Sequence, residues 1–152
     1  MVRGGEILAR IEKSIEINAS PEKVWPMVFW DRVPEYIDSI KKAKYTCEEK
    51  ACVGATAHIF SDVGGIKNEW DAKTTEWIEN KKHAWSTFGG NFKAIGSMTF
   101  NPIADGINAT FLMDYDLPYS VFGKLIDKLR VSKDMDQSME RGMRILKKIA
   151  EK

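Results

Sequence analysis

Apolar and polar residues alternate along much of the chain, which is the period of a strand with one face turned to a core. Ile11, Ile15 and Ile17 recur between Glu and Lys residues, so a first strand is predicted over 8–17. Turn-forming residues separate later alternating segments at near-regular spacing, which is typical of an antiparallel meander. Six more strands are predicted, at 40–48, 53–62, 66–78, 83–89, 92–101 and 107–116.

The alternation also indicates which residues of each predicted strand face the core and which face water. In the last predicted strand one face carries only apolar or aromatic residues, namely Ile107, Ala109, Phe111, Met113 and Tyr115. The strand at 66–78 turns its charged residues to water, and its inward set is mixed: Ile66, Asn68, Trp70, Ala72 and Thr74. A surface that only packs a core is not expected to be so polar. The mixture indicates a cavity behind this strand.

Helices are predicted on both sides of the meander. Ser20 is a suitable N-cap and Pro21 suits the first helical position. Pro26 removes a backbone donor inside this helix, so two short kinked helices are predicted, at 21–30 and 32–39.

A long helix is predicted from about 120 to 150, with an apolar stripe of Leu125, Leu129, Met139, Met143, Leu146 and Ala150. Ser132 and Asp136 interrupt this stripe, and Met135 lies beside it. A helix that packed tightly along its whole length would not be interrupted there. We expect Asp136 to be rotated outward, with Met135 in the inner position.

Composition narrows the class of protein. With 152 residues, 43% of them hydrophobic, and a net charge of +1, the chain is expected to form one globular domain. Nearly balanced charges disfavour a nucleic-acid partner, because phosphate binding needs a clustered positive surface. No apolar run approaches the length of a membrane span and no cleavable leader is recognised, so a cytoplasmic location is expected.

Cys47 and Cys52 lack the second pair of ligands that a zinc site requires, so no metal is predicted. Two interpretations of this pair remain. The cysteines could face each other across a hairpin as reduced thiols, or form a cross-strand disulfide. A reducing cytosol favours the thiols.

The order of strand, two short helices, six-stranded meander and long terminal helix resembles the helix-grip fold of the START-like (SRPBCC) superfamily. The segment SIEINASPEKVW at 14–25 is similar to its opening signature, and Pro34-Glu35-Tyr36 is similar to its second-helix segment. The run FGKLIDKL at 122–129, with LKK at 146–148, resembles the terminal helix of its polyketide cyclase/dehydrase and lipid-transport branch. Pro26 departs from the pattern.

The resemblance implies an α+β fold in which a seven-stranded curved antiparallel sheet wraps around the long C-terminal helix. In that fold the sheet and helix leave an apolar cavity with a few polar groups, as small-molecule sites generally do. Its candidate ligand-binding residues are Tyr45, Asn68, Trp70, Trp85, Phe111, Met113, Tyr115, Ser132, Met135 and Met139. Each is also compatible with ordinary core packing. Asn68 or Ser132 could fix a ligand's carbonyl or hydroxyl, or Asn68 could cap a neighbouring backbone group.

No catalytic motif, phosphate-binding loop or dinucleotide fingerprint is recognised, so no catalytic residue and no cofactor are predicted. His58 and His83 are isolated in the sequence. A general acid/base role would require one of them to face the cavity beside a polar group such as Tyr45 or Asp62.

Three functions therefore compete. The first is a carrier or sensor of a lipid, isoprenoid quinone or polycyclic ligand, and the second a cyclase/dehydratase-type enzyme acting on a polyketide-like substrate. The third is a protein-interaction module of the chaperone-activator kind. An enzyme should place a histidine and a polar partner in the cavity, a carrier should show a pocket without that pair, and an interaction module a filled core with an exposed apolar patch.

Transient contact with an anionic membrane is a further hypothesis, based on Lys41, Lys42, Lys44, Lys81, Lys82, Lys147 and Lys148. Solvated strand and helix faces explain the same lysines more simply.

Overall fold

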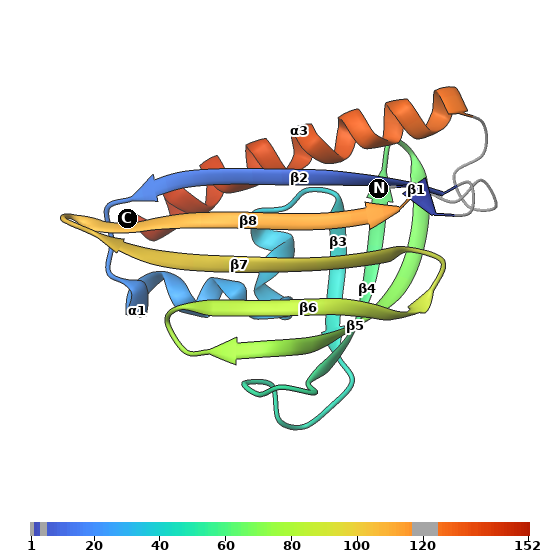
Figure 1. Ribbon diagram of the computed structural model, residues 1–152. Helices are drawn as coiled ribbons and strands as arrows, with labels where there is room; N and C mark the ends of the chain where they lie inside the picture. The colour runs from blue at the N-terminus through green and yellow to red at the C-terminus, as the bar shows by residue number, and fades with distance from the viewer. Residues whose placement is uncertain (1, 4–5, 117–124) are drawn as a thin grey trace.

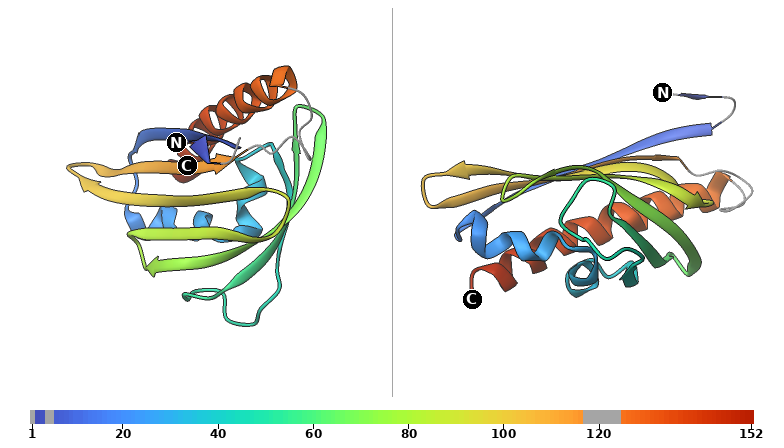
Figure 2. Two further views of the ribbon diagram at one scale, coloured as in Figure 1. Left: turned by 45° about the vertical axis from the view of Figure 1, so that its right-hand side comes forward. Right: turned by 90° about the horizontal axis from the view of Figure 1, so that it is seen from below.

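Strands in the described residues form one curved antiparallel sheet (Figures 1 and 2). The computed structural model describes residues 2–3, 6–116 and 125–152. Its strands are β1 (Val2–Arg3), β2 (Glu6–Ile17), β3 (Ile40–Tyr45), β4 (Thr56–Val63), β5 (Ile66–Ile78), β6 (Lys82–Gly90), β7 (Lys93–Ile103) and β8 (Gly106–Asp116). Their order in the sheet is β1-β2-β8-β7-β6-β5-β4-β3. The seven predicted strands and the meander are confirmed, and β1 adds a two-residue edge.

The pairing of β2 with β8 joins the start of the chain to the end of the meander. Ile17 lies opposite Ile107 and Ile11 opposite Met113. The predicted inward faces are confirmed, since alternate residues of β5 and β8 are buried. At the β4–β5 turn, Gly64 and Gly65 have φ angles of 59° and 85°, a region that glycine adopts without a steric penalty.

The helices lie on the concave side of the sheet (Figure 2). They are α1 (Pro21–Val24), the 3₁₀ helices η1 (Trp25–Val28) and η2 (Trp30–Glu35), and α3 (Leu125–Ala150). The Ser20 cap is confirmed, because its Oγ accepts a hydrogen bond from the Lys23 amide. The prediction of two helices at 21–30 and 32–39 was wrong in detail. Pro26 and Pro34 lack amide donors, and the chain forms short 3₁₀ turns around them.

The C-terminal part of the predicted α3 stripe is confirmed, because Met139, Met143, Leu146 and Ala150 are buried. Its continuation to Leu129 was wrong, since Leu129 is 64% exposed, whereas Val131 is fully buried. Positions four and eight residues before Met139 are Met135 and Val131, so Leu129 falls on the outer face. Asp136 points outward as predicted and pairs with Lys13 Nζ at 3.0 Å. The predicted helix start at 120 and the Leu125 side chain lie outside the described residues.

Cys47 and Cys52 lie in the loop between β3 and β4 rather than opposite each other on paired strands. Both thiols are free, and each donates a hydrogen bond to the Glu49 carbonyl, at 3.2 and 3.5 Å. In the described ranges 2–3, 6–116 and 125–152, no helix has the length and hydropathy needed to cross a lipid bilayer.

Candidate functional site

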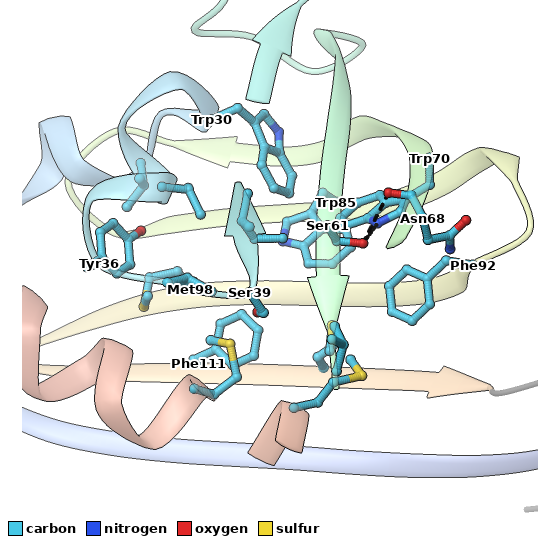
Figure 3. A pocket seen from close by; sticks show the side chains of 18 of the residues that line it. Trp30, Tyr36, Ser39, Ser61, Asn68, Trp70, Trp85, Phe92, Met98 and Phe111 are labelled. Atoms are coloured by element: carbon cyan, nitrogen blue, oxygen red, sulfur yellow. Dashed lines mark hydrogen bonds between the residues drawn. The ribbon is translucent and has the colours of Figure 1, made fainter. Parts of the chain in front are cut away.

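An apolar cavity of about 80 Å³ lies between the concave face of the sheet, the 3₁₀ helices and α3 (Figure 3). Val28, Trp30, Val33, Tyr36 and Ile37 line it from the short helices and the turn after them, and Met135 and Met139 from α3. The strands and their connections supply Ser39, Ile40, Ser61, Val63, Ile66, Asn68, Trp70, His83, Trp85, Phe92, Met98, Phe111 and Met113. None of these residues carries a charged carboxylate, ammonium or guanidinium group.

Seven of the ten candidate residues lie on this wall: Asn68, Trp70, Trp85, Phe111, Met113, Met135 and Met139. Tyr45, Tyr115 and Ser132 are described but lie outside the lining set. The Tyr45 hydroxyl accepts a hydrogen bond from the Trp30 amide at 2.9 Å, and burial raises the pKa of Tyr45 to about 12. Tyr115 is buried behind Phe92 and pairs with the Ser132 hydroxyl at 2.8 Å. Direct ligand contact by the seven remains a prediction.

Three tryptophans form one end of the cavity. The Trp70 and Trp85 rings are stacked with centroids 5.8 Å apart, and Trp30 stands edge-on to both, at 6.1 and 5.2 Å. Gly96, opposite Trp85 on β7, makes this arrangement possible, because a Cβ there would overlap the six-membered ring of Trp85. The three rings therefore present a broad, rigid aromatic surface.

The cavity wall has few polar groups, and only some of them have hydrogen-bond partners among the described residues. Trp70 Nε1 donates to Ser61 Oγ at 3.3 Å, and Ser61 Oγ donates to the Asn68 carbonyl at 3.4 Å (Figure 3). Asn68 Oδ1 accepts a hydrogen bond from the Glu69 amide. This contact corresponds to the second role predicted for Asn68, the capping of a neighbouring backbone group. Trp30 Nε1 is buried, and no described residue accepts a hydrogen bond from it.

His83 faces the cavity and has a polar neighbour. Its Nε2 lies 3.1 Å from the Thr74 hydroxyl, and the ring also forms a hydrogen bond with the backbone of Val28. Burial lowers the pKa of His83 to about 4, so the ring is neutral near pH 7. The position meets the criterion set for an enzyme, although Thr74 and Val28 already bind the ring.

His58 lies on the opposite, outer face of the sheet. Its Nε2 contacts Glu69 and its Nδ1 contacts Asp71, each at 2.8 Å. The hydrogen bonds to Glu69 and then to Asp71 raise the pKa of His58 above its usual value. This histidine cannot reach a ligand in the cavity.

The cavity is bounded on one side by the contact between α3 and the β4–β5 turn. Ser39, Val63 and Ile66 line it there and are only half-buried. A Cβ on Gly64 would press on the Asp134 carboxylate of α3, so this turn lies directly against the helix. Nearby, Asp38 binds both Arg141 and Ser138 of α3, at 2.9 and 2.7 Å.

Several lining residues were missed by the sequence analysis, above all Trp30, Phe92 and Met98. Trp30 follows a proline-interrupted helix, where periodicity no longer assigns a face. Phe92 directly precedes β7 and continues the buried alternation of Ala94, Met98 and Phe100, so the predicted strand at 92–101 could have identified it. Met98 belongs to the inward face of β7, and the same alternation that identified β8 could have found it.

Comparison with known proteins identifies a matching family and a related bacterial protein. The family described as polyketide cyclase / dehydrase and lipid transport matches residues 9–151. An uncharacterized 17.2 kDa protein of Streptomyces lincolnensis, from the melC2-rnhH intergenic region, is 27% identical over 124 residues, which cover 80% of this chain and 78% of that protein.

Solved structures share the fold. TTHA0849 from Thermus thermophilus has a TM-score of 0.78 at 21% identity, covering 93% of this chain and 97% of that one. The ZhuI aromatase/cyclase from Streptomyces sp. R1128 has a TM-score of 0.76 at 14% identity, covering 95% and 94%. Ginseng major latex-like protein 151 from Panax ginseng has a TM-score of 0.66 at 15% identity, covering 95% and 98%. At these identities the similarity establishes the helix-grip fold alone.

Proposed function

The chain belongs to the polyketide cyclase / dehydrase and lipid transport family, and from that premise we propose that it is a carrier or sensor that binds an uncharged apolar molecule in its cavity. The observation that carries this proposal is a cavity wall of aromatic, aliphatic and methionine side chains without a charged residue among those described. Burial of ligand surface against such a wall contributes roughly 25 cal/mol per Å². A lipid, isoprenoid quinone or polycyclic compound has that kind of surface.

The cavity is small for the ligands that this function implies. About 80 Å³ is well below the roughly 300–1,000 Å³ of pockets that hold drug-sized ligands. A ligand must therefore enlarge the space as it enters. Met98, Met113, Met135 and Met139 all line it, and unbranched methionine side chains can adopt new rotamers at low cost.

The first experiment is native mass spectrometry of the purified chain, followed by extraction and identification of any small molecule that it releases on denaturation. Binding of added tetralin, a small bicyclic hydrocarbon, is then measured by calorimetry. Val63→Phe adds a ring to the half-buried side of the cavity, and Ile95→Phe adds the same ring to the outer face of β7 as a matched control.

The proposal predicts a co-purified apolar molecule or tetralin binding, with at least about a tenfold loss of tetralin affinity in Val63→Phe, or about 1.4 kcal/mol, and none in Ile95→Phe. An empty protein that binds neither tetralin nor other apolar probes would contradict it.

The enzyme alternative is favoured by one observation, the His83–Thr74 pair beside the cavity. In that function a neutral His83 would accept a proton from a substrate held against the tryptophans. His83→Gln would then abolish turnover of a polyketide-like substrate while leaving tetralin binding within about twofold. Equal activity in the variant and the original chain would remove this alternative.

The interaction-module alternative has weaker support. It requires a filled core, whereas the interior contains a cavity. Phe88 and Ile95 are 60% and 59% exposed on neighbouring strands, but nothing in the structure indicates a protein partner that covers them.

A further inference from the structure

Four acceptor atoms of the cavity wall are already engaged. Ser61 Oγ receives the Trp70 indole N–H, Ser39 Oγ contacts the Ser138 hydroxyl, and Asn68 Oδ1 receives the Glu69 amide. His83 Nε2 is paired with Thr74. A ligand that brings a hydrogen-bond donor finds each of these acceptors occupied.

The donors on the same wall are different. Trp30 is 4% exposed, and its Nε1 is buried without an acceptor among the described residues. A buried donor without an acceptor costs on the order of 1–3 kcal/mol, so this N–H group requires an explanation. Trp85 and the half-buried Asn68 add two further side-chain N–H donors to the same wall, and no described residue accepts a hydrogen bond from Trp85 Nε1 or Asn68 Nδ2.

We infer that Trp30, Trp85 and Asn68 form a recognition site for a neutral oxygen acceptor, of which a ligand carbonyl is the simplest example. This inference rests on the proposed function, because it assigns a polar contact to the apolar ligand. The ring centroids of Trp30 and Trp85 lie 5.2 Å apart, so the two indoles border the same end of the cavity. The carbonyl oxygen supplies the acceptor that the protein itself lacks there.

The ligand is uncharged, because no lysine or arginine of the described residues lines the cavity. A carboxylate moved from water into this apolar space would lose its hydration without gaining a counter-ion. A neutral oxygen loses far less hydration free energy than a carboxylate when it leaves water, and a hydrogen bond from an N–H donor compensates for that loss.

Two other tryptophans provide internal comparisons. Trp70 faces the same cavity, but Ser61 already satisfies its N–H. Trp25 Nε1 also has no acceptor in the part of the chain that the structure describes, but Trp25 does not line the cavity and packs edge-on to Trp77 and Phe100. The competing explanation for an unpaired indole is a weak N–H contact with a neighbouring ring face.

The test uses three bicyclic probes: tetralin, its ketone 1-tetralone, and the carboxylate 2-naphthoate. Their dissociation constants are measured by calorimetry for the full chain and for Trp85→Phe, Asn68→Leu and the control Trp70→Phe. Trp85→Phe and Asn68→Leu should each weaken 1-tetralone roughly 3- to 10-fold more than tetralin. Trp70→Phe should weaken both by the same factor, and 2-naphthoate should bind least tightly.

Indole N–H resonances in ¹⁵N-labelled protein give a readout that needs no substitution. 1-Tetralone should move the Trp30 and Trp85 signals downfield, whereas tetralin should not, and Trp25 should respond to neither.

Failure of both probes to bind would overturn the proposed function itself. Binding of both, with equal losses in every variant and no downfield shift, would leave the proposed function intact and overturn the acceptor site. Tightest binding by 2-naphthoate would overturn the claim that the ligand is uncharged.

Discussion

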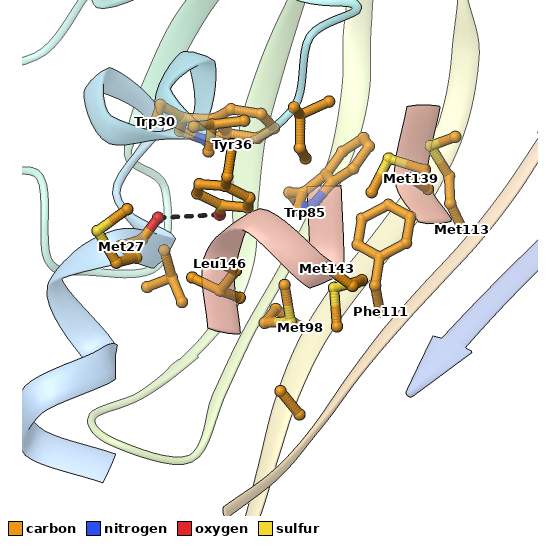
Figure 4. Packing of buried hydrophobic residues seen from close by; sticks show 14 of the residues in the cluster. Met27, Trp30, Tyr36, Trp85, Met98, Phe111, Met113, Met139, Met143 and Leu146 are labelled. Carbon is orange, nitrogen blue, oxygen red and sulfur yellow. Dashed lines mark hydrogen bonds between the residues drawn. The ribbon is translucent and has the colours of Figure 1, made fainter. Parts of the chain in front are cut away.

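The two ends of the interior are built from the same residue types but packed differently. At the closed end, which we define by Trp25, Phe100, Met143 and Leu146, the Trp25 and Phe100 rings meet edge-on. Met143 and Leu146 of α3 are buried in the same hydrophobic cluster (Figure 4). At the open end, which we define by Trp30, Trp70, Trp85, Met135 and Met139, the same kinds of side chain surround a cavity. Hydrophobic composition alone therefore does not separate a core from a binding site.

Available space distinguishes the open end, because an indole N–H without a described acceptor occurs at both ends, on Trp25 and on Trp30. The closed end stabilises the fold through dense contact, while the open end leaves methionine side chains beside empty space. The two ends should respond differently to the same chemical change, and four predictions use that difference.

Leu146→Ala should have the largest effect. Leu146 is 1% exposed at the closed end, so its truncation leaves a new cavity and should lower the free energy of unfolding by about 4 kcal/mol. Urea denaturation measures the loss, and tetralin affinity should stay within about twofold. A loss below about 1 kcal/mol would show that the closed end is not tightly packed.

Acidification should act through His83 at the open end. Its folded pKa is about 4, so between pH 6.5 and 4 the unfolded chain binds a proton that the folded chain does not. Stability should therefore fall as the pH falls through this window, by as much as about 3 kcal/mol. His83→Gln should flatten the urea-derived stability profile there, and an unchanged profile would contradict a neutral, buried His83.

Met139→Ala should cost less than Leu146→Ala. Met139 is buried to a similar extent but already borders empty space, so its removal loses fewer contacts, about 1–2 kcal/mol. The enlarged cavity should bind tetralin at least as tightly as before. The comparison would fail if the two truncations were equally destabilising and Met139→Ala abolished tetralin binding.

His58 should give the smallest effect, with the opposite sign to His83. Its pKa is raised in the folded state, so its contribution is fully present below about pH 6.5 and is lost as the pH rises through the folded pKa. Partial exposure and solvent screening limit it to less than about 1 kcal/mol. Relative to His58→Gln, the original chain should be slightly more stable at pH 6 than at pH 9.

Much of the fold could be predicted from the sequence because the strands are amphipathic. The alternation in β5 and β8 assigned their faces, and the mixed inward set of β5 correctly indicated a cavity. The helices were harder to predict. Prolines at 26 and 34 remove backbone donors and leave only short turns. In α3 the stripe from Met139 onward was predicted correctly, but the sequence did not show whether Leu129 or Val131 continues it toward the N-terminus.

The polar details of the site could not be predicted, because they depend on contacts between distant strands. Nothing in the local sequence shows that Ser61 satisfies Trp70 while Trp30 stays unpaired. The alternation of each strand places His83 on the face of Trp85 and His58 on the face opposite Ile59. The hydrogen-bond partners of the two histidines could not be predicted, because they come from other segments of the chain.

The most direct test of ligand binding at the open end is ¹³C-methyl NMR of the methionines during a titration with tetralin. The methyl signals of Met98, Met113, Met135 and Met139 should shift and saturate, because these residues line the cavity. Those of Met27 and Met143, which do not line it, should remain in place. No shift at high tetralin concentration, or equal shifts in all six, would contradict a ligand site confined to the open end.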